Sequence, residues 1–259
     1  MCIRDRDICI WVMTVDYVTA ITLIILLAII FWLGYFVYIS KLRFSFILGF
    51  IIGGVGWTIA YFLRMPILLY VQQFPSLIVV ITIAASLAGI FEESFRYFFA
   101  KKWDFLSKRN GEIISFGIGW GMFEVFLIHT LSWVNIMLAI MLGIPIPGLT
   151  PLPTPDALFW TGLIGSYERN LAVAFHVGVT LIIAKALTDR KFLGVAIVAH
   201  ALLDFITVYF AIIFGVYVAE AILFVLVVAL YAFIWKELAI DLKTIFLKSD
   251  EFFIEQKSS

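Results

Sequence analysis

Hydrophobic residues follow one another in seven long stretches, and most of the charged residues lie in the short segments between them. A stretch of about 20 mostly apolar residues is long enough to cross the hydrocarbon core of a membrane as a helix. The stretches of this length are 15–39, 44–63, 77–100, 112–142, 167–187, 192–211 and 215–235. The pattern predicts an all-α fold, a polytopic transmembrane helical bundle of about seven spans.

The regions outside these stretches are short. Residues 1–14 form an N-terminal extension that matches no targeting pattern, and Met13 is an alternative start, so part of this extension could be non-native. Residues 15–235 are interpreted as one membrane domain and residues 236–259 as a cytoplasmic tail. The segment 143–167 is rich in proline, which disfavours helix and sheet. We expect it to be a structured external loop or cap.

The composition supports a membrane protein and excludes several other classes. The chain is 64% hydrophobic and only 14% charged, whereas soluble domains contain about 25% charged residues. The formal net charge is zero, so nothing indicates a nucleic-acid partner. The two cysteines, Cys2 and Cys9, precede the first span and can build neither a disulfide framework nor a cysteine metal site.

Basic residues indicate how the spans are oriented, because Lys and Arg accumulate in cytoplasmic loops. They gather after the first, third, fifth and seventh stretches, whereas the alternate loops hold only Arg64. The residues in question are Lys41, Arg43, Lys101, Lys102, Lys108, Arg109, Lys185, Arg190, Lys191, Lys236, Lys243, Lys248 and Lys257. The alternation predicts that the N-terminus lies outside and the C-terminus inside, in what we expect to be the plasma membrane.

Ionisable residues inside the apolar stretches are the candidate functional residues, because charged groups in the hydrocarbon core are costly and tend to mark functional sites. At a rise of about 1.5 Å per residue they fall in one layer about 8 Å thick, toward the cytoplasmic side. They are Glu92, Glu93, Arg96, Glu124, His176, His200 and Asp204. A shared depth on four helices predicts one site.

Spacing within each helix supports this interpretation. Arg96 follows Glu92 by four residues and Glu93 by three, so it can pair with either, and His200 and Asp204 are also four apart. Small residues before Glu124 let neighbouring helices approach closely. Simpler roles are expected elsewhere: a core position for His129, a local pair or helix cap for Glu168 and Arg169, and a bundle or interface contact for Glu220.

Four motifs on successive helices carry a resemblance to a known family. They are Glu92-Glu93-Ser94-Phe95-Arg96-Tyr97, then Gly117-x-Gly119-x-Gly121-x-x-Glu124, then Glu168-Arg169 with His176 seven residues on, and His200-x-x-x-Asp204. Together they resemble the YhfC-type intramembrane protease family, which is related to the CAAX prenyl endopeptidase and bacteriocin-immunity group and to PrsW-like proteases. The resemblance covers about residues 77–210.

The resemblance implies that Glu92 or Glu93 activates a water molecule, while His176 and His200 orient groups and stabilise the oxyanion. The chain departs from the CAAX enzymes in two ways. Its arginine follows the first glutamate by four positions instead of five, and its last motif ends in Asp204 instead of asparagine. An ionised aspartate cannot donate a hydrogen bond to an oxyanion, so Asp204 is expected to orient His200 or to bind a metal.

The sequence does not decide whether the site binds a metal ion. Glu124, His176 and His200 would make a zinc site of two histidines and one carboxylate with water in the fourth position. However, the chain lacks the His-Glu-x-x-His motif, and the resemblance also allows glutamate-activated water without metal. One Zn²⁺, another divalent metal and no metal all remain compatible with the sequence.

The sequence therefore predicts an intramembrane endopeptidase, either glutamic or metal-dependent, surrounded by membrane lipid and acting on a peptide or membrane-protein substrate. One alternative is a proton- or ion-coupled secondary transporter, which also needs buried Glu, His and Asp. Against it, the chain shows no inverted internal repeat and no pair of matching broken helices. Another alternative is a catalytically inactive scaffold with the same fold.

Overall fold

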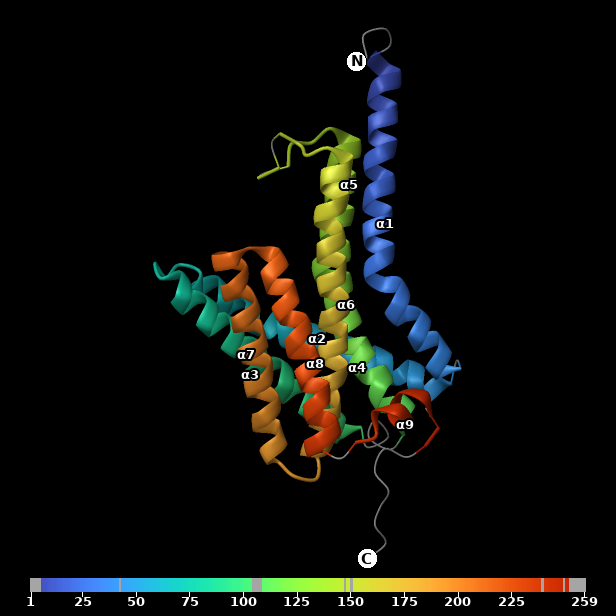
Figure 1. The fold of residues 1–259 in the computed structure, drawn as a ribbon, viewed down its shortest axis with the longest axis vertical. Coiled ribbons are helices and arrows are strands. Elements are labelled where there is room, and N and C mark those ends of the chain that lie inside the picture. Colours follow the sequence, from blue (N-terminus) through green and yellow to red (C-terminus); the bar gives the residue numbers. More distant parts are fainter. Residues whose placement is uncertain are drawn as a thin grey trace, which may run out of the picture. The chain divides into compact units, whose positions relative to one another are not determined.

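The computed structural model describes residues 6–41, 43–103, 109–146, 148–149, 151–238, 240–248 and 250–251, and within these ranges the regular structure is helical (Figure 1). The helices are α1 (Arg6–Ser40), α2 (Phe44–Val71), α3 (Leu77–Lys102), α4 (Asn110–Glu124), the π-helix η2 (Val125–Thr130), α5 (Leu131–Leu142), α6 (Pro155–Ala186), α7 (Lys191–Phe214), α8 (Val216–Glu237) and α9 (Leu242–Leu247). In the described part of the chain, seven helical segments are long and apolar enough to cross a membrane, with α4, η2 and α5 forming one of them. The chain is an all-α, multi-pass membrane protein, which confirms the predicted fold class.

Three helices have boundaries that the apolar pattern predicts wrongly. α1 begins at Arg6 instead of near residue 15, so residues 6–14 of the predicted extension are helical. α2 runs to Val71 instead of ending near residue 63, so Arg64 lies inside it and not in a loop. α6 begins at Pro155, so the second half of the segment 143–167 is helical. A proline at the first helical position costs no hydrogen bond, because the backbone N–H there has no partner within the helix. The proline-rich segment therefore ends where its last proline starts a helix.

The chain divides into two compact units, which we describe separately. The first consists of Met1–Phe31 and Val125–Asn170, and the second of Trp32–Glu124 and Leu171–Ser259. In the first unit, Tyr17, Ile21 and Leu158 form a buried core. The Tyr17 hydroxyl donates a hydrogen bond of 2.6 Å to the backbone carbonyl of Pro153, which ties α1 to the segment that precedes α6.

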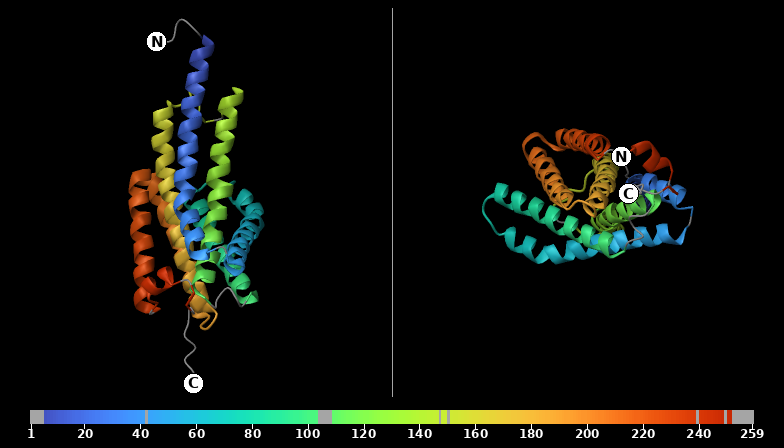
Figure 2. Two further views of the ribbon diagram at one scale, coloured as in Figure 1. Left: turned by 90° about the vertical axis from the view of Figure 1, so that its right-hand side faces the viewer. Right: turned by 90° about the horizontal axis from the view of Figure 1, so that it is seen from below.

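Close helix packing characterises the second unit. α2 and α3 run side by side (Figure 2), and α2 also packs on α4 while α3 packs on α7. A Cβ added to Gly89 on α3 would lie 2.5 Å from the carbonyl oxygen of Ile197 on α7, and one added to Gly121 would lie 2.8 Å from Cα of Val173 on α6. Glycine is required where backbones approach this closely. The predicted role of the α4 glycines is therefore confirmed at Gly121.

The described part of the tail packs against other residues of the second unit, to which it belongs. α9 follows Asp241, whose side chain accepts a hydrogen bond from the backbone N–H of Lys243. Ile245 is buried, and the Tyr35 hydroxyl on α1 donates to the carbonyl of Phe246 at 2.8 Å. Arg43, just before α2, forms an ion pair with Asp250. The tail thus contacts residues near the end of α1 and just before α2.

Candidate functional site

Three ionisable side chains of α3 lie deep inside the second unit. Glu92, Glu93 and Arg96 have at most 1% of their surfaces exposed. An unpaired charge in apolar surroundings would cost several kcal/mol or more. Each of these groups must therefore be paired, and the partners come from four other helices.

Glu93 is held by an arginine and a histidine. Arg96 Nη1 donates to Glu93 Oε2 at 3.0 Å, and His200 Nδ1 on α7 lies 2.6 Å from Glu93 Oε1. The other ring nitrogen of His200, Nε2, is 3.7 Å from Asp204 Oδ2. That separation is too long for a direct hydrogen bond and suits a bridging water. Both oxygens of Glu93 are thus engaged by the protein.

Glu92 has a different set of partners. Its Oε1 forms an ion pair of 2.8 Å with Nη1 of Arg64 on α2, and its Oε2 accepts a hydrogen bond of 3.1 Å from Nε1 of Trp120 on α4. Successive residues on a helix project about 100° apart, so the two neighbouring glutamates face different helices. Arg96 therefore pairs with Glu93, while α2 supplies a second arginine for Glu92.

His176 on α6 connects the α3 cluster to Glu124. Arg96 Nη2 lies 2.8 Å from His176 Nδ1. A guanidinium can only donate, so Nδ1 accepts, and in the neutral ring Nε2 carries the proton. His176 Nε2 then donates to Glu124 Oε2 at 2.7 Å. The tautomer of His176 is fixed by Arg96, and the orientation of Glu124 is fixed by His176.

His200 contacts Glu93 directly, whereas His176 contacts Arg96 and Glu124 and offers a ligand atom within 4.8 Å of Glu92. Glu124 and Asp204 also join the cluster, at its more accessible edge: their side chains are 16% and 36% exposed. The catalytic roles of these residues stay predictions. The structure adds Arg64, which the apolar pattern places in a loop.

Two signals could have revealed the added partners. The apolar sequence continues from Met65 to Val71, so Arg64 is flanked by apolar residues on both sides. Trp120 lies four residues before Glu124 on the same glycine-rich helix, which places it on the same face. Its indole also lies under the Arg96 guanidinium, with 4.6 Å from the guanidinium carbon to the ring centroid.

The residues for which simpler roles are predicted lie elsewhere. His129, Glu168 and Arg169 belong to the first unit. Glu168 and Arg169 form a local ion pair, which confirms that expectation, and His129 is 8% exposed, as expected of a core residue. Glu220 is a buried residue of α8.

Comparison of the chain with protein-family models, with curated proteins and with solved structures finds no match in any of the three.

The donor groups of the cluster fit a divalent cation by type and by charge. Among the described residues, Glu92, Glu124 and His176 each offer a ligand atom within 4.8 Å of the others. Zinc accepts such carboxylate and imidazole ligands. This set differs from the predicted Glu124, His176 and His200, because it contains Glu92 in place of His200.

The charges of the cluster can be balanced by a cation or by protons. The cluster contains four carboxylates (Glu92, Glu93, Glu124 and Asp204) and the guanidiniums of Arg64 and Arg96. Counting each carboxylate as −1 and each guanidinium as +1, these six side chains carry a formal charge of about −2. Either a divalent cation or two protons would balance it. A bound cation would have to replace the proton on His176 Nε2.

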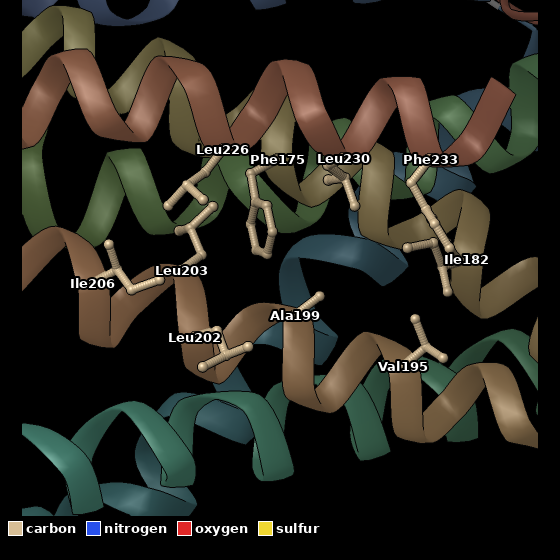
Figure 3. Close-up of a pocket in the computed structure, with 10 residues that line it drawn as sticks. All are labelled: Phe175, Ile182, Val195, Ala199, Leu202, Leu203, Ile206, Leu226, Leu230 and Phe233. Atoms are coloured by element: carbon tan, nitrogen blue, oxygen red, sulfur yellow. The ribbon is translucent and has the colours of Figure 1, made fainter. Parts of the chain in front are cut away.

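An apolar cavity of about 290 Å³ adjoins the cluster between α6, α7 and α8 (Figure 3). Ten hydrophobic side chains line it, among them Phe175, Ala199 and Leu226. The ring of Phe175 stands edge-on to that of His200, with 5.1 Å between the centroids. Two lining residues, Val195 and Leu202, are 36% and 52% exposed, so the cavity reaches the outer surface of this unit. Phe175 thus lines the cavity and also contacts a histidine of the polar cluster.

Proposed function

We propose that the protein is an intramembrane endopeptidase that hydrolyses peptide bonds with a carboxylate-activated water. The supporting observation is the buried, hydrogen-bonded array in which α3, α4, α6 and α7 bring Glu92, Glu124, His176 and His200 together. Groups that are so costly to bury are retained in membrane helices mainly for chemistry or transport. The resemblance to YhfC-type proteases agrees with this function.

Glu92 is the general base in this proposal. Ligand atoms of Glu92, Glu124 and His176 lie within 4.8 Å of one another. Three groups at that spacing can each be about 2.8 Å from one shared water, which is a normal hydrogen-bond length. Glu93 has a supporting role in this proposal, because the group of ligand atoms contains Glu92, Glu124 and His176 and not Glu93. Glu92 thus combines burial with access to a water that Glu124 also contacts.

The chemistry follows from these positions. Glu92 takes a proton from the water while the oxygen attacks the peptide carbonyl carbon, and the carboxylates then return a proton to the leaving amine. His200 lies beside the cavity and can donate from Nε2 to the developing oxyanion when that nitrogen is protonated. A divalent cation held by Glu92, Glu124 and His176 would supply Lewis-acid activation of the water, and Glu92 would then be a ligand instead of the base.

The cavity beside His200 accommodates an apolar residue next to the scissile bond, and its exposed rim gives a membrane-embedded substrate a lateral route. We expect the leucine side chain in Ala199→Leu to fill part of this cavity. The rate of cleavage next to large apolar residues should then fall by about 10-fold, while the rate of cleavage next to alanine should persist. Val198→Leu on the exposed face of α7 is the matched control. If Ala199→Leu cleaves next to large apolar residues as fast as the wild type does, the cavity does not bind the substrate as proposed.

The proposed orientation is N-terminus out and C-terminus in, at the plasma membrane. Arg64 lies in α2 and pairs with Glu92, so it no longer counts as a basic residue of an outer loop. The segments 72–76 and 143–154 contain no Lys or Arg. Their contrast with the basic loops supports this orientation.

The direct test is incubation of the purified protein, in lipid nanodiscs, with a mixture of apolar peptides, followed by mass analysis of the products. Peptide pairs that sum to a parent sequence plus water support an endopeptidase. Proton or ion flux in vesicles, without such products, would support the transporter instead.

A further inference from the structure

Arg64 is the least expected charged group of the second unit. It lies within α2 with only 9% of its surface exposed. Its guanidinium carbon lies 5.6 Å from the ring centroid of Tyr61, and its Nη1 is 2.8 Å from Glu92 Oε1. An arginine in a membrane span is costly and needs a partner. Glu92 is the partner that the structure gives it.

One face of α2 delivers this arginine to the cluster. Gly56, Ala60 and Arg64 are spaced four residues apart, so they lie on one side of the helix. A Cβ on Gly56 would lie 2.7 Å from the ring of Trp120, and Ala60 is fully buried. The same face therefore packs on Trp120, the second partner of Glu92, and carries Arg64, the first.

The two glutamates consequently have separate supports. Glu92 is held between Arg64 and Trp120, and Glu93 between Arg96 and His200. Loss of Arg64 would free one oxygen of Glu92 without touching any contact of Glu93. This separation allows the two supports to be tested independently.

We propose that Arg64 is the positioning residue for Glu92: it fixes the carboxylate in the orientation that faces Glu124 and His176. The inference rests on the proposed function, in which Glu92 is the base. Arg64 acts through Glu92 and contacts no reacting atom. α2 thereby becomes part of the active site, although none of the four sequence motifs lies on it.

Arg64→Gln is expected to lower kcat by about 100-fold with KM changed less than about 2-fold, because a misoriented base impairs chemistry and leaves substrate binding intact. Arg64→Lys should restore about 10-fold of this loss, since lysine keeps the charge but offers only a point contact. Glu220→Gln, which alters a buried ionisable group of α8, is the matched control and should keep its activity. Thermal unfolding in detergent establishes that each variant is folded.

A double-mutant cycle separates positioning from a general structural role. In the Glu92→Gln background, Arg64→Gln should not lower the residual activity further. In the Glu93→Gln background, Arg64→Gln should lower kcat by the same factor as in the wild type. Equal additional losses in both backgrounds would overturn the inference, as would wild-type kcat in Arg64→Gln. If Arg64→Gln does not fold, Arg64→Lys carries the same cycle. If the wild type cleaves peptides and Glu92→Gln loses this activity while the Arg64 variants keep it, the inference about Arg64 is wrong and the proposed function stands. If the wild type cleaves no peptide, the proposed function is wrong as well.

Discussion

At the scale of single residues, the cluster is a set of mutually dependent pairs. Arg96 contacts Glu93, the ring nitrogen of His176 and the face of Trp120 at once. Removal of one partner from a buried pair leaves an uncompensated charge and typically costs about 3–5 kcal/mol. The stability of this unit and the geometry of its candidate site therefore depend on the same side chain.

We expect Arg96→Met to lower the free energy of unfolding by about 3–5 kcal/mol, because Glu93 loses its cation in a fully buried position. Arg43→Gln should lower it by less than about 1 kcal/mol, since the pair with Asp250 is about half exposed to solvent. Denaturant unfolding in mixed micelles measures both. Similar losses in the two variants would contradict the burial argument.

The sequence predicts most of the cluster at this scale, and its omissions have physical reasons. Glu92, His176 and His200 are conspicuous because each interrupts an apolar stretch. The pattern does not predict Arg64 as a member of the cluster, because a charged residue ends the apolar stretch and Arg64 is therefore assigned to the following loop. Trp120 escapes because a hydrophobicity pattern treats an indole as apolar and ignores its N–H. The choice of Arg64 for Glu92 and Arg96 for Glu93 depends on side-chain directions that spacing alone leaves open.

At the scale of the helices, backbone contacts at glycines set the distances within the site. Gly89 lies on α3 one turn before Glu93, and its contact is with Ile197 and Ala201, which flank His200 on α7. The 2.6 Å separation of Glu93 and His200 therefore depends on the close approach of these two helices.

Gly89→Ala is accordingly expected to reduce peptide cleavage by about 10–100-fold, because the added Cβ must push α3 away from α7 and displacements near 1 Å have effects of this size. Gly194→Ala on α7 is the control: a Cβ there meets nothing within 4 Å, so activity should persist. Cleavage rates of the two variants with one peptide decide the matter. Equal rates would show that the approach of α3 and α7 does not control the site.

Element boundaries are where sequence and structure differ most. The apolar pattern predicts the existence of all seven spans, because span length is set by the thickness of the membrane core. It places the start of α6 about twelve residues too late, since proline at the first helical position is allowed and only proline inside a helix is disruptive. The packed tail is also missed, because its contacts join residues about 200 positions apart, such as Tyr35 and Phe246.

At the scale of the whole molecule, the orientation in the membrane is a separate prediction. A reporter fused after residue 259 should be cytoplasmic, and one inserted near Thr154 should be external, because the basic loops lie on the side of the C-terminus. Paired fusions of a periplasmic and a cytoplasmic reporter measure this in cells. The reverse labelling would contradict the orientation and would place the basic loops on the outside.

The central claim is that Glu92 activates water to cleave a peptide bond within the membrane domain. The most direct measurement is digestion of an apolar peptide in heavy-oxygen water, with mass analysis of the fragments. We predict that the new C-terminal carboxyl contains one oxygen from the solvent, and that Glu92→Gln lowers the rate of its formation by about 100-fold or more, since a general base contributes about 10²–10⁴-fold. A new C-terminal carboxyl without oxygen from the solvent would contradict the claim. Equal rates of cleavage in the wild type and in a folded Glu92→Gln variant would also contradict it.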